Sequence, residues 1–408
     1  MRKPALIKRP IMSDKFKQTD VLIIGASASG LMCAIEAGKR GRKVVVLDHA
    51  NRAGKKILMS GGGRCNFTNM NIEAENYLSH NPHFCKSALS RYTQWDFIAL
   101  VNEHNIAYHE RDLGKLFCDN SAKDILDMLL DECKKAKVKI ILDCRIEDIK
   151  KTDSGRFTIK TSVAGFSAAS CVIASGGLSI PKMCASPLGY KVAEQFGLHL
   201  WPTSPGLVPF TLQPQDKQKL ETLAGISVEC LVSNERAQFR ENILFTHRGL
   251  SGPAILQISS YWRPGETINI DFLPDINVVE WLTARRKKQP QVKLKTVIAE
   301  ILPKRLLPVL LNSAFIEQPL QNLSKEKINN IAKKLQQWQI KPNATEGYRT
   351  AEVTLGGVDC DEISSKTMES KKVKGLFFIG EVIDVTGWLG GYNFQWAWSS
   401  GWCAGQVV

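Results

Sequence analysis

Glycines at a fixed spacing after an apolar run are the first sign of chemistry in this chain. Gly25, Ser27 and Gly30 stand in a G-x-S-x-x-G pattern directly after the apolar run of residues 21–25. Glycines here allow a tight turn and close helix packing, and the N-terminus of the following helix then faces a pyrophosphate. Asp48 ends the next apolar run, where a ribose-binding carboxylate belongs, although such an acid can also cap a helix. Together these residues predict a dinucleotide site, in which Ser27 replaces the usual middle glycine.

Three consecutive glycines at residues 61–63 are the second feature. Glycine loses the most conformational freedom on folding, so a fold keeps such a run mainly where the backbone touches a ligand or adopts a positive φ. The alternative is a flexible surface loop, but the apolar residues on both sides argue against it. We expect Gly62 to contact the ligand, Lys56 or its neighbour Lys55 to neutralise a phosphate, and Arg64 to hold an oxygen-rich edge.

Two further glycine-containing turns follow apolar strands later in the chain. Residues 172–177 resemble the turn at which flavoproteins return to their cofactor, and residues 376–381 end in a glycine and an acid. In flavoproteins of this type, that acid holds the ribityl chain. The helix that follows directs its positive N-terminal end at the flavin and favours the anion of the reduced ring. The cofactor contacts predicted from this part of the chain are Ile146, Ser175, Gly176, Gly380, Glu381, Asp384, Gly391, Tyr392 and Asn393.

The cysteines and histidines form no metal-binding or disulfide pattern. None of the eleven cysteines belongs to a C-x-x-C pair, and the seven histidines are scattered. We therefore expect reduced thiols, no metal and no disulfide-reductase chemistry. The catalytic candidates are Cys65, which follows the three glycines, and His247 with Arg248, which precede a helix start at Pro253. The alternatives are inert packing for Cys65 and a structural role for His247.

Positive charge is concentrated in two segments. The net charge is +14, of which residues 1–19 contribute +5 and residues 276–345 contribute +9, so that the rest of the chain sums to zero. This distribution favours a surface that binds a polyanion such as RNA, although a basic surface can also serve solubility alone. The candidate contacts are Arg285, Arg286, Lys287 and Lys288. No apolar run is long enough to span a bilayer and the N-terminus has no apolar signal core, so we expect a cytoplasmic protein without a membrane partner.

The order of the apolar runs predicts an α/β protein. Residues 21–25 and 44–48 flank a helical run and open a doubly wound fold. We expect a Rossmann FAD domain of the two-dinucleotide-binding type, with an inserted small β domain and a basic helical cap. The predicted parts are a disordered basic tail at 1–19, FAD-domain segments at 20–196 and 346–408, an inserted β domain at 197–275 and a basic helical insert at 276–345.

Several longer segments resemble signatures of the BaiN-like family of bacterial flavoproteins. They are residues 55–69, 244–262, 345–358 and 380–402, and the resemblance covers residues 20–408. It implies FAD as the cofactor and NAD(P)H as the electron donor. One branch of this family reduces uridine in ribosomal RNA to dihydrouridine, and another reduces carbon–carbon double bonds conjugated to a ketone in oxidised bile acids.

Both activities deliver a hydride from the flavin to the β-carbon of a C=C–C=O unit and a proton to the α-carbon. In uracil these atoms are C6 and C5, and Cys65 or His247 is the predicted proton donor. Together with the basic segment, the resemblance favours reduction of uridine in 23S ribosomal RNA or its precursor. A small-molecule enone reductase, which needs no basic segment, and a non-catalytic flavin-dependent RNA-binding protein are the alternatives.

Overall fold

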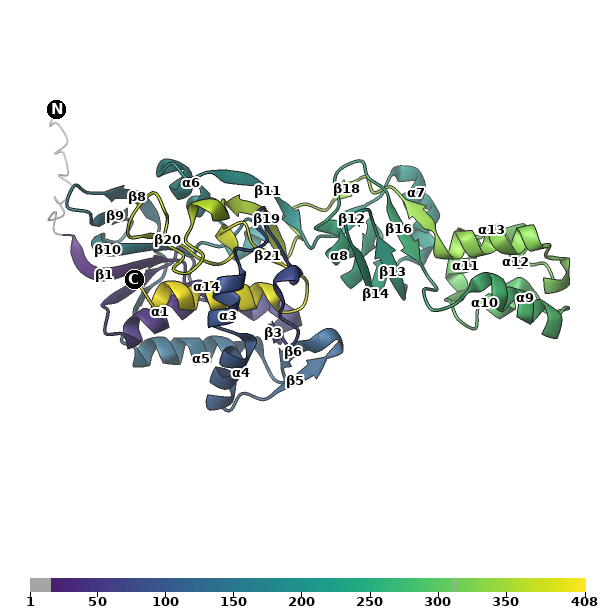
Figure 1. Cartoon of the computed structure of the whole chain (residues 1–408), viewed down its shortest axis with the longest axis horizontal. Coiled ribbons are helices and arrows are strands. Elements are labelled where there is room, and N and C mark those ends of the chain that lie inside the picture. The colour runs from purple at the N-terminus through teal and green to yellow at the C-terminus, as the bar shows by residue number, and fades with distance from the viewer. Residues whose placement is uncertain (1–15, 312) are drawn as a thin grey trace, which may run out of the picture.

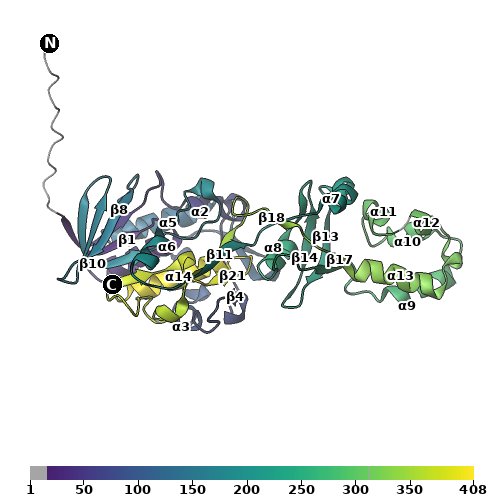
Figure 2. The ribbon, with the colours of Figure 1, turned by 90° about the horizontal axis from the view of Figure 1, so that it is seen from above.

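Three parts follow one another along an elongated molecule. The computed structural model describes residues 16–311 and 313–408. Figures 1 and 2 show an α/β domain that contains both ends of the described chain, then an antiparallel sheet, and then a group of helices at the far end. Most of the predicted disordered tail lies outside the described residues. Residues 17–19, however, belong to the first strand, so the predicted tail extends too far.

A seven-stranded sheet forms the centre of the α/β domain. Five strands are parallel, in the order β7-β2-β1-β10-β20, and the antiparallel strands β9 and β8 extend the sheet. Their bounds are β1 Lys17–Ile24, β2 Val44–Leu47, β7 Lys139–Ile141, β8 Ile146–Lys151, β9 Phe157–Thr161, β10 Gly165–Ile173 and β20 Leu376–Phe378. Residues of β2 are buried on both faces, as in a central parallel strand. The predicted doubly wound α/β domain is thus confirmed, and β20 brings the C-terminal segment into it.

Helices α1 (Ala28–Lys39), α5 (Ala122–Lys135) and α14 (Tyr392–Gly405) lie along one side of this sheet (Figure 1), with α1 packed against the other two. In α5, the buried residues Ile125, Met128 and Leu129 recur at the helical spacing. The Ser121 hydroxyl accepts a hydrogen bond from the Lys123 N–H and caps this helix. Among the described residues, no helix combines the length and the apolar character needed to cross a membrane.

Short elements surround the glycine-rich segments. Strands β3, β6 and β5 form a small antiparallel sheet, and β4 pairs with β21. The bounds of these elements are α2 Lys55–Met59, β3 Asn66–Asn69, β4 Tyr77–Leu78, α3 Lys86–Arg91, α4 Gln94–Glu103, β5 Tyr108–Arg111, β6 Lys115–Cys118, α6 Leu188–Gln195 and β21 Thr386–Gly387.

A second, antiparallel sheet forms the middle of the molecule, in the order β17-β16-β13-β14-β15-β12-β18. Its strands are β12 Phe210–Thr211, β13 Ser227–Ser233, β14 Gln238–Phe245, β15 Gly249–Ser251, β16 Ile268–Asp271, β17 Trp338–Ile340 and β18 Ala344–Thr345. Helix α8 (Pro253–Ser259) packs on β13 and β14, and α7 (Pro214–Leu220) connects β12 to β13. Apolar residues between Phe210 and Ile340 form a core separate from that of the α/β domain.

The insertion is bounded by two paired strands. Because β11 (Leu200–Gly206) pairs with β19 (Val353–Val358), both strands belong to the α/β domain. The insertion therefore starts after residue 206 and ends before residue 353, so the predicted boundaries at 197 and 345 are corrected.

The helices occupy a shorter segment than predicted and lie at the far end of the insertion. They are α9 Val278–Lys288, α10 Leu294–Ile298, α11 Leu307–Leu310, α12 Ser313–Ile316 and α13 Lys325–Gln336. Residues 338–345 return to the antiparallel sheet as β17 and β18. Figures 1 and 2 show the helices beyond that sheet, so they extend away from the α/β domain and do not cover it as a cap.

Candidate dinucleotide-binding site

A cavity of about 760 Å³ lies at the carboxyl ends of the parallel strands. Residues that follow three of these strands line it: Gly25 after β1, Asp48 after β2 and Ala174 after β10. Ligands of open α/β sheets bind at this edge, in the crevice outside the strand ends. The volume lies within the range of about 300–1,000 Å³ that is usual for cofactor and small-molecule sites. Position and size therefore favour a cofactor site.

Two close backbone contacts shape the first glycine-rich turn. Gly25 has a φ of +121°, and a Cβ atom there would lie 2.2 Å from the carbonyl oxygen of Ala174. At Gly30, a Cβ atom would lie 1.9 Å from the carbonyl oxygen of Gly25. Both positions therefore require glycine. They bring the N-terminus of α1 to the cavity beside Ser27, where backbone N–H groups and the helix dipole favour an anion.

The carboxylate of Asp48 lies at the cavity and fixes the same turn. Its Oδ2 accepts a hydrogen bond from the Ala26 N–H at 2.7 Å, and its Oδ1 accepts one from the Ala50 N–H at 2.8 Å. Each carboxylate oxygen has a second acceptor position. Asp48 can therefore hold the turn and bind a ribose hydroxyl at the same time.

Lys56 and Glu381 meet in the cavity wall. Lys56 Nζ lies 3.0 Å from Glu381 Oε2 and donates a hydrogen bond of 2.9 Å to Ser179 Oγ. Glu381 Oε1 accepts hydrogen bonds from Ser179 Oγ and from the Thr354 N–H. Burial opposes the ionisation of Glu381, but the charge of Lys56 and these hydrogen bonds hold the pKa of Glu381 below its usual range. Glu381 is therefore a carboxylate at neutral pH.

A second pair of glycines opens α14 onto the same cavity. Gly391 has a φ of +96°, and a Cβ atom there would lie 2.3 Å from the carbonyl oxygen of Thr68. The Asn393 side chain holds the preceding turn, because it accepts a hydrogen bond from the Gly387 N–H and donates one to the Gly387 carbonyl. The N-terminus of α14 thus lies in the cavity wall, where its partial positive charge favours an anion.

These features together fit a dinucleotide cofactor. The cavity has a carboxylate at Asp48 and the N-termini of α1 and α14 in its wall. The Oγ atom of Ser175, also in the wall, is buried and has no hydrogen-bond partner among the described residues. Since buried hydroxyls normally have partners, Ser175 is suited to contact a bound group. No cluster of His, Cys, Asp and Glu that could hold a metal ion occurs in residues 16–311 and 313–408.

One side of the cavity faces the antiparallel sheet of the insertion. Trp388 lines the cavity, donates a hydrogen bond of 2.7 Å from Nε1 to the Tyr261 hydroxyl, and packs edge-on against Phe239. Lys115, also in the wall, forms an ion pair of 2.5 Å with Glu241. These contacts attach the insertion to the rim of the cavity, so that its position is coupled to the site.

Most of the predicted cofactor contacts lie in the cavity wall. They are Gly25, Ser27, Asp48, Lys56, Gly62, Ile146, Ser175, Gly176, Glu381, Gly391 and Asn393. The remaining five predicted contacts do not line the cavity: Gly30, Arg64, Gly380, Asp384 and Tyr392. Gly30 and Gly380 serve close helix packing, the latter against Ser29 of α1. The Tyr392 ring packs against the ring of Tyr77. The Arg64 side chain is exposed to solvent outside the cavity wall.

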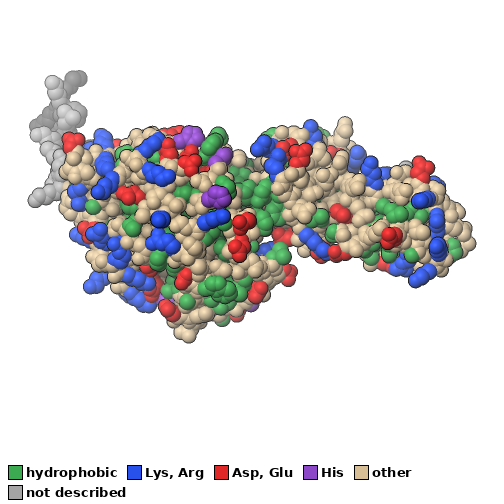
Figure 3. Space-filling view, in the orientation of Figure 1, with side chains coloured by type: hydrophobic (Ala, Val, Ile, Leu, Met, Phe, Trp, Pro, Cys, Tyr) green, Lys and Arg blue, Asp and Glu red, His purple; other side chains and the backbone are tan. Residues whose placement is uncertain are grey.

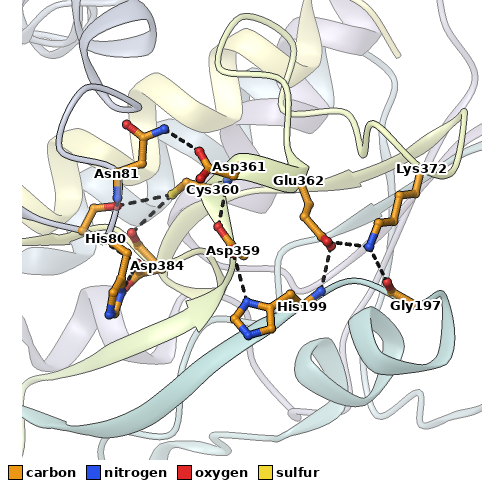
Figure 4. Close-up of polar contacts among 11 residues, drawn as sticks. His80, Asn81, Gly197, His199, Asp359, Cys360, Asp361, Glu362, Lys372 and Asp384 are labelled. Atoms are coloured by element: carbon orange, nitrogen blue, oxygen red, sulfur yellow. Dashed lines mark hydrogen bonds and ion pairs between the residues drawn. The ribbon is translucent and has the colours of Figure 1, made fainter.

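Asp384 belongs to a polar cluster outside the cavity (Figure 4). Its Oδ2 accepts a hydrogen bond from the His80 N–H and lies 2.7 Å from His80 Nδ1. The His80 ring stacks on Trp201, with ring centroids 3.7 Å apart. In the same cluster His199 Nδ1 lies 2.9 Å from Asp359 Oδ2. Asp384 therefore joins distant segments of the α/β domain and lies outside the cavity wall.

The structure does not bring the three predicted catalytic residues together in the cavity. Cys65 follows the three glycines, but its side chain is fully buried, and burial raises the pKa of its thiol above the usual range. His247 and Arg248 are exposed on the insertion, where Arg248 Nη1 lies 3.2 Å from Glu346 Oε2. None of the three lines the cavity.

Two of the four basic residues predicted to contact RNA are held in internal contacts. Arg285 pairs with Glu300, and Arg286 donates a hydrogen bond to the Leu323 carbonyl. Lys287 and Lys288 are exposed, and within the described ranges they have no hydrogen bond or ion pair. Figure 3 shows further Lys and Arg side chains at this end of the molecule. The two lysines are thus available to a partner, whereas the arginines organise the helices.

Several cavity residues carry no pattern that predicts them from the sequence. They are His49, Arg52, Lys115, Arg145, Cys184 and Glu352. Lys55, the predicted alternative to Lys56, also lines the cavity. Lys55 Nζ lies 3.2 Å from the sulfur of Cys184, which is the one cysteine of the eleven that is not buried. Glu352 stands in residues 345–358, one of the segments that resembled a family signature. That resemblance was the only signal for it.

The chain matches known proteins over nearly its whole length. The family model described as HI0933-like protein Rossmann domain matches residues 19–407. The chain is 54% identical over 389 residues to the ribosomal RNA dihydrouridine synthase of Escherichia coli (strain K12), with 95% of this chain and 97% of the relative covered. It is 30% identical over 405 residues to the 3-dehydro-bile acid delta(4,6)-reductase of Clostridium scindens, with 95% of this chain and 98% of the relative covered.

A solved structure shares the fold at low sequence identity. It is 3-ketosteroid-delta4-(5alpha)-dehydrogenase from Rhodococcus jostii RHA1, with a TM-score of 0.50 and 13% identity over 97% of this chain and 98% of that one. The names of the two sequence relatives correspond to the two activities described for the BaiN-like family, reduction of uridine in ribosomal RNA and reduction of double bonds in oxidised bile acids. Since the family model and the 54% identical relative both span nearly the whole sequence, the chain belongs to the HI0933-like Rossmann-domain family.

Proposed function

We propose that this protein is an FAD-dependent reductase that converts a uridine of 23S ribosomal RNA, or of its precursor, to dihydrouridine with NAD(P)H as the electron donor. The observation that carries the proposal is 54% identity across 95% of the chain to a relative named ribosomal RNA dihydrouridine synthase. The dinucleotide-type cavity supports the cofactor independently. Ribosomal RNA is cytoplasmic, so we place the protein there.

The wall of the cavity offers a partner for each part of FAD. Asp48 would hold the ribose of the adenosine half, and the N-terminus of α1 at Ser27 would hold the pyrophosphate. Glu381 and Ser175 would hold the ribityl chain, and the N-terminus of α14 at Gly391 would lie at the flavin ring. Bound FAD supplies hydride transfer, which protein side chains cannot perform.

The residues of the chain position the reactants and exclude water. The N-terminus of α14 lies in the cavity wall and would stabilise negative charge on a bound ring system, because a helix N-terminus carries free N–H groups and a partial positive charge. The ion pair of Lys56 and Glu381 holds α2 against the C-terminal segment. Met59, Leu207 and Trp388 add apolar surface to the wall, which strengthens electrostatic interactions within it.

The position of the two unpaired lysines, far from the cavity, is consistent with a long substrate such as RNA. Lys287 and Lys288 lie at the end of α9 in the helical part, whereas the cavity lies in the α/β domain, on the other side of the antiparallel sheet (Figure 1). A substrate that contacts both must be extended and anionic. Phosphate contacts position such a substrate, and the target uridine must leave its stack to enter the cavity.

Nucleoside mass spectrometry of ribosomal RNA from cells with and without the gene tests the proposal. We expect dihydrouridine in 23S RNA to disappear on deletion and to return with the wild-type gene. A Gly25→Val gene should not restore it, because its side chain would collide with the Ala174 carbonyl in the first glycine-rich turn. Unchanged dihydrouridine after deletion would refute the proposal.

A reductase of small conjugated enones is the second candidate. It is favoured by the 30% identical relative named 3-dehydro-bile acid delta(4,6)-reductase and by the apolar part of the cavity wall. Oxidation of the NADPH-reduced protein by a 3-oxo-Δ4 steroid, measured beside oxidation by ribosomal RNA, separates the two candidates. A flavin-dependent RNA-binding protein without catalysis would be oxidised by neither.

A further inference from the structure

The side chain of Lys115 crosses the start of α14 at the cavity wall. Lys115 belongs to β6, and a Cβ atom at Gly390 would lie 2.9 Å from Lys115 Cε and 3.0 Å from Lys115 Cγ. The Lys115 side chain therefore extends along Gly390, the residue before the N-cap of α14 at Gly391. Its ammonium group, one bond beyond Cε, lies beside this helix start. Both Lys115 and Gly390 line the cavity.

The partner of this ammonium group comes from the insertion. Lys115 Nζ lies 2.5 Å from Oε2 of Glu241 on β14, and the two side chains are only 15% and 10% exposed. Glu241 Oε1 lies 3.5 Å from Nε2 of Gln257 on α8, and Gln257 Oε1 accepts a hydrogen bond of 3.0 Å from the Leu389 N–H. The insertion therefore holds the turn before α14 at two points, through Lys115 and through Leu389.

The charge of Glu241 reaches the start of α14. Burial, together with this charge, raises the pKa of Tyr392 to about 12. Tyr392 is the first residue of α14. Water screens an exposed ion pair strongly, whereas a pair with little access to water is screened much less. A change in either charge of the pair should therefore be felt in the adjoining cavity.

The two charges of the pair have opposite effects on an anion at this end of the cavity. The N-terminus of α14 carries a partial positive charge, and the ammonium group of Lys115 adds to it. The carboxylate of Glu241 opposes both. Because Lys115 belongs to the α/β domain and Glu241 to the insertion, the net charge beside Gly390 depends on the contact between these two parts.

We propose that the insertion sets the electron affinity of the bound flavin through the pair of Lys115 and Glu241, an inference that rests on the proposed function for the position of the flavin ring. A hydride from NAD(P)H adds two electrons and one proton to the flavin and leaves one negative charge on the ring. Lys115 favours this charge, and Glu241 is a positioning residue that holds and offsets Lys115. The insertion, which carries the unpaired Lys287 and Lys288, thus also adjusts the reactivity of the flavin.

Titration of the oxidised protein with sulfite tests this role without RNA or NAD(P)H. Sulfite forms a reversible bond to N5 of oxidised flavin and leaves a negative charge on the ring, so its affinity reports how well the site holds that charge. In Glu241→Gln, the unopposed charge of Lys115 should lower the Kd of sulfite by about tenfold, as expected for one charge near the ring at an effective dielectric constant of about 20. In Lys115→Met, the unopposed charge of Glu241 should raise this Kd by a similar factor.

The reduction potential of the flavin should move in the same sense as the affinity for sulfite. For a two-electron couple a tenfold change corresponds to about 30 mV. We therefore expect a higher potential in Glu241→Gln and a lower potential in Lys115→Met, each by about this amount. The double variant Lys115→Met with Glu241→Gln carries no charge at either position, so both its sulfite Kd and its potential should return close to the wild-type values.

An exposed ion pair in the helical part provides matched controls. The Lys293 and Glu317 side chains are each about half exposed, and they lie beyond the antiparallel sheet (Figure 1). Lys293→Met and Glu317→Gln make the same changes in net charge and should leave the sulfite Kd and the potential unchanged. Flavin content and thermal unfolding of each variant establish that the fold is intact. If Lys115→Met retains no flavin, Glu241→Gln and the double variant decide.

The outcomes separate this inference from the proposed function. Opposite shifts in the two single variants, cancelled in the double variant, support the inference. Shifts of the same sign, or no shift in either variant, would overturn it, because they would reflect disturbed packing or a flavin ring that lies elsewhere. Opposite shifts in a protein that forms no dihydrouridine would refute the RNA substrate alone. Dihydrouridine formation by a wild-type protein whose variants bind sulfite equally well would refute this inference alone.

Discussion

Lys56 Nζ lies 3.0 Å from the carboxylate of Glu381, although the two residues are 325 positions apart in the chain. The contact joins the glycine-rich segment near the N-terminus to the segment before the last helix. Ser179 bonds to both partners and so connects the turn after β10 to the pair. The cavity wall is thus a meeting point of three distant segments.

Lys56→Met should destabilise the protein because it leaves the half-buried Glu381 carboxylate without its counter-charge. We expect the free energy of unfolding to fall by about 1–3 kcal/mol or more, as for other buried polar groups that lose a partner. Urea denaturation of the cofactor-free protein measures this. Lys219→Met on the exposed face of α7 is the control and should have little effect. Equal stability of the Lys56 and Lys219 variants would show that the ion pair is not structural.

Asp48→Ala should weaken FAD binding, because it removes a ribose acceptor and both hydrogen bonds that hold the first glycine-rich turn. A loss of about 1–3 kcal/mol corresponds to a rise in Kd of about five- to 150-fold. Flavin fluorescence during titration of the cofactor-free protein measures the affinity. Asp153→Ala, at an exposed turn, should bind FAD normally. An unchanged Kd for Asp48→Ala would place the ribose elsewhere.

Reversing the charge of Lys287 and Lys288 should weaken RNA binding and reduce its salt dependence. Each lost phosphate contact lowers the slope of log affinity against log salt by about 0.7–0.9, so two contacts account for roughly 1–2. Filter binding at several salt concentrations measures the slope. Lys134→Glu with Lys160→Glu makes the same change in charge on the α/β domain and should have a smaller effect. Equal losses for both pairs would mean that RNA responds only to total charge.

Glu132 should make the stability of the α/β domain depend on acidic pH. Its buried carboxylate contacts Lys135, Lys39 and His104 at distances of 2.7–3.2 Å. Burial opposes ionisation, but these partners lower the pKa of Glu132 to about 2. Because the folded pKa is depressed, the stabilisation is complete above the unfolded pKa of about 4.3 and is lost as the pH falls through the folded value.

Denaturation of wild type and Glu132→Gln from neutral to acidic pH checks this sign. The wild type should be the more stable protein near neutral pH, and the difference should shrink as the pH falls below about 4. Glu235→Gln, in the exposed turn between β13 and β14, is the control and should follow the wild type throughout. A difference that stays constant with pH would show that Glu132 acts through packing and not through its charge.

The glycine-rich turns could be predicted because a chain that turns directly after a strand or into a helix often needs a positive φ, and Gly25 and Gly391 both have one. The carbonyls with which a Cβ atom at these positions would collide belong to distant segments and were not part of the prediction. The acids after apolar runs, Asp48 and Glu381, could be placed by the same reasoning. Glycine-rich turns near both ends of the sequence also predicted that the α/β domain is built from an N-terminal and a C-terminal segment.

Residues that depend on long-range packing could not be placed in this way. Cys65 stands beside three glycines, yet the side on which its thiol lies depends on how the core packs around it. Glu352 reaches the cavity only because β11 and β19 pair across the whole insertion. The same pairing moves the start of the insertion from residue 197 to after residue 206. Arg285 and Arg286 have partners on other helices, so their charge alone did not indicate a free surface.

Formation of dihydrouridine by the purified protein tests the central proposal most directly. The protein is mixed with NADPH and 23S ribosomal RNA from cells that lack the gene, and the digested RNA is analysed by nucleoside mass spectrometry. We predict that dihydrouridine appears with wild-type protein and is absent without NADPH. RNA that stays free of dihydrouridine, although the flavin of the wild-type protein is fully reduced by NADPH, would contradict the proposed reaction.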